Sequence, residues 1–193
     1  MSDRKFIASA SQTIGPFYGF ALTTNPALGA MARPGAHGEP VQLVVRVLDG
    51  EGNAVPDSMV ELWQADAHGT YRHPEDPQAS QPDPALEGFG RLGTNADGEA
   101  AFTTVKPGRV PGPGGALQAP HINVTVFARG ILLHLYTRIY FAGDPANDQD
   151  PILALVSETR RSTLLAHPDR KQPGLWRFDI HLCGGGETVF FDW

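Results

Sequence analysis

The chain has 193 residues, of which 41% are hydrophobic and 19% are charged, and its formal net charge is −6. This composition is typical of a folded globular domain and excludes a disordered chain, which would be poorer in apolar residues. Nucleic acids and anionic membranes attract clustered Lys and Arg. The acidic balance therefore favours a small molecule or another protein as the partner, with no nucleic acid and no membrane.

The N-terminal residues contain no apolar run long enough for a signal peptide, and no later segment approaches the ~20 apolar residues of a membrane span. We therefore expect a cytoplasmic protein. The single cysteine, Cys183, excludes an internal disulfide and a cysteine-based zinc site. We interpret it as a small buried apolar residue.

Residues 1–40 are interpreted as an N-terminal arm, because residues 7–40 are rich in Gly, Pro, Ala and Thr and show no clear periodicity. Such an arm is expected to lie on a surface, that of a partner chain, instead of forming a core of its own. Residues 41–193 are expected to form one β-domain.

Apolar side chains alternate with period two from residue 41 to residue 48, which predicts a strand. Residues rich in β-branched and aromatic side chains predict further strands at 58–64, 99–105, 122–127, 132–141, 176–182 and 188–191. Seven short strands favour an all-β fold, an antiparallel β-sandwich. A short helical insertion near the C-terminal third is predicted from about 151 to 166, with Asp150 as its cap.

Polar and apolar side chains alternate strictly from His121 to Val126, so His121 and Asn123 share a face opposite the core. Two histidines at these positions could bind one metal ion. The second position is Asn123, however, and a neutral carboxamide is a poor ligand for a ferric or zinc ion. The pattern favours His121 as a hydrogen-bonded core histidine.

Three further features have two interpretations each. Tyr71 ends a predicted strand, where a phenolate could bind a hard cation, although tyrosine more often packs there. Arg129 follows the strand of His121 and could bind a ligand's carboxylate or pair with an acid. His68 and His73 lie in a polar loop without recognisable metal-site spacing, so we interpret them as surface histidines.

Several segments resemble motifs of the intradiol ring-cleaving dioxygenases in both order and spacing. They are residues 11–18, 61–65, 97–108 and 120–123. The resemblance extends from about residue 9 to the C-terminus. Residues 127–130, 137–141 and 186–192 are similar to the α chain of a two-chain member of this family.

The family holds ferric iron with two tyrosines and two histidines. The phenolate oxygens of the tyrosines are hard donors that stabilise the ferric state. The resemblance places the first tyrosine at Tyr71 and the first histidine at His121. The second tyrosine falls on Val110 and the second histidine on Asn123, and the substrate-stabilising arginine falls near Gln118. The resemblance therefore implies that this chain holds no metal and no catalytic residue, and that Tyr71 and His121 are vestigial.

The resemblance further implies that Fe(III) is held by a homologous β chain, while this chain borders the same pocket. The matching substrate-binding positions are Thr13, Pro16, Phe17 and Arg129, with Phe17 standing where tyrosine is common. The implied reaction cleaves 3,4-dihydroxybenzoate (protocatechuate) with O2 to 3-carboxy-cis,cis-muconate. The alternatives are a self-sufficient intradiol dioxygenase with atypical ligands and a β-sandwich binding module.

Overall fold

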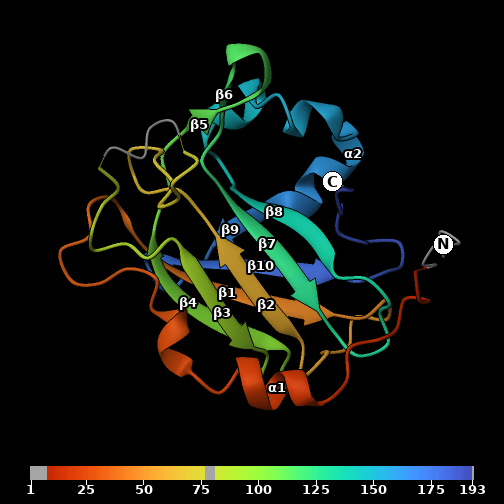
Figure 1. The fold of residues 1–193 in the computed structure, drawn as a ribbon. Coiled ribbons are helices and arrows are strands. Elements are labelled where there is room, and N and C mark those ends of the chain that lie inside the picture. Colours follow the sequence, from red (N-terminus) through yellow and green to blue (C-terminus); the bar gives the residue numbers. More distant parts are fainter. Residues whose placement is uncertain (1–7, 77–80, 193) are drawn as a thin grey trace, which may run out of the picture.

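The computed structural model describes residues 8–76 and 81–192 (Figure 1). Its strands are β1 (Pro40–Leu48), β2 (Met59–Trp63), β3 (Phe89–Gly93), β4 (Glu99–Val105), β5 (Val110–Pro111), β6 (Leu117–Gln118), β7 (His121–Phe127), β8 (Leu135–Phe141), β9 (Leu165–Pro168) and β10 (Leu175–His181). The α-helices are α1 (Phe17–Leu22) and α2 (Glu158–Arg161), and the 3-10 helices are η1 (Pro26–Gly29), η2 (Pro113–Gly115), η3 (Pro145–Gln149), η4 (Leu153–Leu155) and η5 (Ser162–Leu164). None of the helices in this described part is long and apolar enough to cross a membrane.

Eight strands form one mixed sheet in the order β3-β2-β7-β8-β9-β10-β1-β4, and β5 pairs with β6 separately. The prediction of an all-β fold is confirmed. The expectation of a purely antiparallel arrangement is wrong, because β1 pairs with β10 in parallel and β8 pairs with β9 in parallel. The sheet curves so strongly that the domain is nearly barrel-shaped (Figure 1).

The main core lies inside this curved sheet and takes its side chains from both of its halves. In β1 the alternate residues Val41, Leu43, Val45 and Val47 are all buried, as the period of two predicted. Strand β7 contributes Ile122, Val124 and Val126 to the same cluster. The other face of β7 is thereby left for polar side chains.

Six of the seven predicted strands are present, β4 with the predicted ends and the other five with shifted ends. The seventh, at 188–191, forms only one isolated bridge, between Tyr136 and Phe191. The sequence did not predict β3, β5, β6 or β9. Strand β3 was not predicted because it contains Gly90, and glycine is uncommon inside strands. The glycine is required there, because an added Cβ would lie 2.8 Å from the side chain of Met31.

The predicted helix from 151 to 166 is broken into short pieces. Val156 has extended backbone angles, with φ −85° and ψ 134°, and separates η4 from α2. Residues Leu165–Pro168 are strand β9, which joins the two halves of the sheet. The residue at the N-cap of η4 is Ile152 and not the predicted Asp150. The Oδ1 of Asp150 nevertheless accepts hydrogen bonds from the backbone nitrogens of Ile152 at 2.9 Å and Leu153 at 2.6 Å, which holds the turn before η4.

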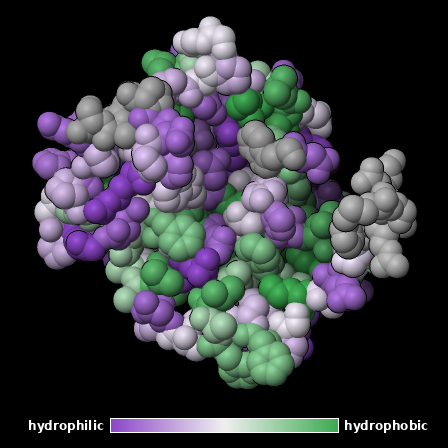
Figure 2. Space-filling model, viewed as in Figure 1, coloured by the Kyte–Doolittle hydropathy of each residue, from purple (hydrophilic) through white to green (hydrophobic). Residues whose placement is uncertain are grey.

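The N-terminal arm divides into two parts. The backbone nitrogens of Met31 and Ala32 donate to the carbonyl oxygen of Thr103 in β4, and the Met31 side chain is fully buried in the main core. This part of the arm therefore packs on the β-domain of the same chain and adds one side chain, Met31, to its core. By contrast, α1 leaves Phe17 79% and Phe20 74% exposed, and apolar side chains gather on the surface around it (Figure 2). Packing of this region on a partner stays a prediction, and residues 1–7 lie outside the described residues.

The interpretations of three reactive side chains have different outcomes. His68 and His73 are exposed, as predicted. Cys183 is also exposed, so the interpretation of a buried residue is wrong. It lies after the end of β10 at His181, where strand alternation no longer directs a side chain toward the core.

Shortening the buried arm residue tests whether residues 26–36 belong to the domain. Met31→Ala should lower the free energy of unfolding by about 2–5 kcal/mol, because it leaves a cavity in the main core. Phe20→Ala, at an exposed position of the same arm, should change it by less than about 0.5 kcal/mol. Urea unfolding of both variants measures the difference. Equal, small losses would contradict the packing of Met31 in the core.

Candidate functional site

The candidate site residues lie at the two ends of strand β7. His121 is its first residue and Arg129 lies two residues beyond its last. A seven-residue strand is about 20 Å long at ~3.3 Å per residue. We call the region of His121 and Tyr71 the upper site, because Tyr71 lines a cavity with Val110 and Pro111 of β5 and β7 begins at His121. The region of Arg129, which lines a cavity with residues of α1, is the lower site. In Figure 1, β5 and β6 are at the top and α1 is at the bottom.

His121 is 2% exposed and belongs to the buried side of the upper site. Its Nδ1 lies 2.8 Å from the carbonyl oxygen of Ala119. Burial, helped by the positive charge of Arg138, lowers the pKa of His121 to about 4. The imidazole is therefore neutral at pH 7, held as the hydrogen-bonded core histidine that the sequence pattern favours.

Tyr71 stacks on Trp63, with ring centroids 6.0 Å apart and planes 11° apart. Its hydroxyl accepts a hydrogen bond from Nδ2 of Asn123 at 3.4 Å. Burial raises the pKa of Tyr71, so the phenol keeps its proton at neutral pH. Val110 is buried beside these rings and lines, with Trp63 and Tyr71, a cavity of about 630 Å³.

The sequence did not identify the polar groups behind the upper site. Arg138 is 7% exposed and donates from Nη1 to Oε1 of Gln118 at 2.7 Å. Tyr140 donates from its hydroxyl to Oδ1 of Asp150 at 3.1 Å, and burial raises the pKa of Tyr140. The available signal was the pairing of β8 with β7, which sets Arg138 opposite Asn123 and Tyr140 opposite His121.

The upper site does not fit a ferric ion. Of the four positions that the resemblance assigns to iron ligands, Val110 offers no donor atom and Asn123 already uses its amide on Tyr71. The nearby carboxylate of Asp150 is engaged by four donors, the backbone nitrogens of Ala119, Ile152 and Leu153 and the hydroxyl of Tyr140. These side chains therefore do not supply the four protein donors of a ferric site.

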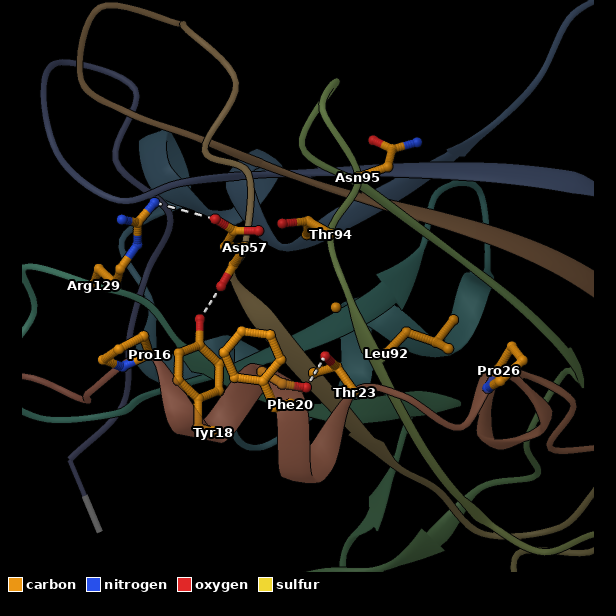
Figure 3. Close-up of a pocket in the computed structure, with 12 residues that line it drawn as sticks. Pro16, Tyr18, Phe20, Thr23, Pro26, Asp57, Leu92, Thr94, Asn95 and Arg129 are labelled. Carbon is orange, nitrogen blue, oxygen red and sulfur yellow. Dashed lines mark hydrogen bonds and ion pairs between the residues drawn. The ribbon is translucent and has the colours of Figure 1, made fainter.

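The lower site gathers three of the four predicted substrate-binding residues. Arg129 is 62% exposed in its side chain and donates from Nη2 to Oδ2 of Asp57 at 3.1 Å. Thr13 accepts a hydrogen bond from the backbone nitrogen of Gly130 at 2.8 Å, which fixes the arm beside Arg129. Pro16 lines a cavity of about 570 Å³ together with Arg129 and Asp57 (Figure 3).

Two further residues of the lower site were missed by the sequence. The hydroxyl of Tyr18 donates to the backbone oxygen of Asp57, and burial, with the nearby charge of Asp57, raises the pKa of Tyr18. Asp57 has a φ of 61°, an uncommon conformation for a residue other than glycine. The fourth predicted substrate-binding residue, Phe17, is exposed. Among the described residues that line the cavity, Phe17 is not found.

Comparison with known proteins identifies the class. The family model described as Dioxygenase matches residues 14–184. The chain therefore belongs to the intradiol ring-cleaving dioxygenase family, and the resemblance inferred from its sequence motifs is confirmed.

Individual relatives narrow this assignment. The chain is 43% identical to the protocatechuate 3,4-dioxygenase alpha chain of Burkholderia cepacia, covering 94% of this chain and 95% of the relative. It is 44% identical to the alpha chain of Pseudomonas putida, covering 94% of both. Its identity to the B. cepacia beta chain is 36%, over 78% of this chain and 67% of the relative.

Solved structures share the fold. The dioxygenase domain of a carbohydrate-binding fusion protein from Streptomyces sp. SirexAA-E matches with a TM-score of 0.60 and 22% identity, covering 98% of this chain and 97% of that chain. Catechol 1,2-dioxygenase from Acinetobacter sp. ADP1 matches with a TM-score of 0.62 and 23% identity, covering 79% of this chain and 55% of that chain. At such identities the comparison establishes the fold alone.

The low pKa of His121 predicts a pH-dependent stability. The folded state holds its imidazole neutral down to about pH 4, whereas in the unfolded chain it takes up a proton near pH 6.5. The unfolded state binds more protons between these values, so stability falls as the pH drops. We expect a loss of about 2 kcal/mol from this group between pH 7 and pH 5.

Urea unfolding at the two pH values measures this loss. His121→Gln should remove most of that difference, since glutamine does not titrate. An undiminished pH dependence in the variant would assign the effect to other groups.

Proposed function

We propose that this chain is the α subunit of a protocatechuate 3,4-dioxygenase and that it holds no iron itself. The enzyme cleaves 3,4-dihydroxybenzoate with O2 to 3-carboxy-cis,cis-muconate, and the β chain holds the Fe(III). The role of this chain is to border the substrate pocket and to bind the carboxylate of the substrate.

The separation of the two sites carries this proposal. Arg129 and His121 lie at opposite ends of β7, about 20 Å of strand apart. One aromatic ring cannot span that length, so a substrate held by Arg129 does not reach the upper site of the same chain. A metal centre that acts on such a substrate must then come from another chain. The beta chain named among the relatives is the natural candidate.

The chemistry of the lower site supports the second half of the proposal. Burying an unpaired carboxylate costs several kcal/mol, and a guanidinium offers it two parallel hydrogen bonds. Arg129 reaches the cavity edge, while Thr13 and Pro16 bring the N-terminal arm to the same place. These residues position the acid end of the ring, which is an orienting and not a bond-breaking contribution.

The surface around the lower site supports assembly with a β chain. Phe17 and Phe20 of α1 are more than 70% exposed, and their rings are arranged edge to face with the centroids 6.5 Å apart. Exposed aromatic side chains of this kind are enriched at protein interfaces. Packing of α1 on the β chain would bury both rings and enclose the lower site at the boundary between two subunits.

Expression with and without the β chain tests where the iron resides. We expect the α chain purified alone to contain far less than one iron per chain and to show no turnover, because Val110 and Asn123 replace two donors. The complex should be coloured by its ferric phenolate and should be active. Tyr71→Phe in the α chain, which keeps the stacking but removes the hydroxyl, should leave the iron content of the complex unchanged. Stoichiometric iron and turnover in the isolated chain would contradict the proposal.

Truncation of the guanidinium tests the substrate contact. Arg129→Ala in the complex should raise KM for 3,4-dihydroxybenzoate about tenfold or more, because a charge-assisted hydrogen bond to the carboxylate is lost. KM for catechol, which has no carboxylate, should change much less. Steady-state kinetics with both substrates measures the contrast.

Arg46→Ala is the matched control. It removes an arginine from another exposed Arg–Asp pair, with Asp179, away from the lower site, and it should affect neither substrate. A rise of equal size for both substrates in Arg129→Ala would argue against a carboxylate-binding role.

A further inference from the structure

The guanidinium that the proposed function assigns to the substrate already has an anionic partner. Asp57 faces Arg129 across the lower site, with Oδ2 3.1 Å from Nη2 (Figure 3). We propose that Asp57 is an exchangeable counter-ion: it yields Arg129 to the substrate carboxylate and pairs with it again to release the product. This inference rests on the proposed function and adds a specificity-determining residue to it.

The Asp57–Arg129 pair is weak enough to exchange. The side chain of Arg129 is 62% exposed and that of Asp57 is 72% exposed. An ion pair between such exposed groups contributes about 0–1 kcal/mol, because water screens the charges and both side chains lose freedom. A substrate carboxylate that binds both arms of the guanidinium in a less hydrated pocket therefore displaces Asp57 at little cost.

After the substrate carboxylate has taken its place on the Arg129 guanidinium, Asp57 stays close by, because its backbone is held on both sides. The adjoining Ser58 exchanges hydrogen bonds with Thr94, through Ser58 N to Thr94 Oγ1 at 2.9 Å and Thr94 N to Ser58 O at 2.7 Å. The hydroxyl of Tyr18 donates to the carbonyl oxygen of Asp57, and on the N-terminal side the backbone nitrogen of Asp57 donates to the carbonyl oxygen of Thr94 at 3.4 Å. A φ of 61° in a residue other than glycine persists only where the surroundings impose it. The carboxylate is thus kept within reach of Arg129 and cannot drift away from it.

The difference in charge between substrate and product explains how a competing carboxylate would help product release. The substrate has one carboxylate, and cleavage between its two hydroxyl-bearing carbons turns both into carboxylates, each gaining one oxygen atom from O2. The product therefore has three carboxylates. A fixed, unopposed cation would retain this trianion more strongly than the substrate. A nearby carboxylate competes with both substrate and product for Arg129 and repels their negative charges. It therefore weakens the binding of both ligands, and it weakens that of the more highly charged product more.

Removal of the charge from Asp57 tests the exchange. Asp57→Asn in the α–β complex keeps a side chain of similar size that tolerates the left-handed backbone. We expect KM for 3,4-dihydroxybenzoate to fall roughly threefold, within the range of an exposed ion pair. The inhibition constant of 3-carboxy-cis,cis-muconate should fall further, roughly tenfold, because of its higher charge. KM for catechol should stay unchanged. Asp57→Gly, which also suits the backbone, should give the same three results.

The matched control is Asp179→Asn, which removes the same charge from the exposed pair with Arg46 and should change none of these constants. A rise in KM for the acid in Asp57→Asn would show that Asp57 only positions Arg129, and unchanged constants would show that it takes no part; either result overturns the inference while leaving the proposed function intact. Equal effects of Arg129→Ala on acid and catechol would overturn the carboxylate role of Arg129, and the inference with it.

Discussion

The strict alternation of strand β7 is the constraint on which both sites depend. Its apolar residues Ile122, Val124 and Val126 are locked into the main core, so its register on β2 and β8 cannot slip by one residue. The same register fixes His121 and Asn123 on the opposite face. The length of the strand then sets how far His121 lies from Arg129. Core packing, rather than any contact between the two sites, decides their separation.

The upper site has become a satisfied part of the interior. Asp150 accepts hydrogen bonds from three backbone nitrogens and from Tyr140, and His121 is neutral and bonded to a backbone carbonyl. A group of this kind is stable because every buried polar atom named here has a partner. The apolar Val110 adds packing where a metal ligand would require a charge to balance it. The fold of the family is therefore kept, while two of the four positions that the resemblance assigns to iron ligands, Val110 and Asn123, are occupied by side chains that do not suit a ferric ion.

The lower site has the opposite character. The side chains of Arg129 and Asp57, and Phe17 and Phe20 of α1, are exposed in the single chain. Exposed charges interact weakly with one another, and the same charges interact more strongly when a partner excludes water from them. Assembly would thus strengthen the hold of Arg129 on an anion without any change in the chain itself. On the proposed function, this is how a subunit could contribute to a site whose iron another chain holds.

The sequence by itself determined the elements and residues that local patterns encode. Period two in residues 41–48 and 121–126 predicted β1, β7 and their buried faces, and the ordered motifs indicated the family and its two absent donors. Contacts between distant segments were decided only by the tertiary structure. Asp57 and Arg129 are 72 positions apart, and nothing in either local pattern indicates that they pair. Leu165 and Ala166 fall within the predicted helix but begin β9, because this segment pairs with β8 on one side and β10 on the other, and neither pairing can be seen in the local pattern.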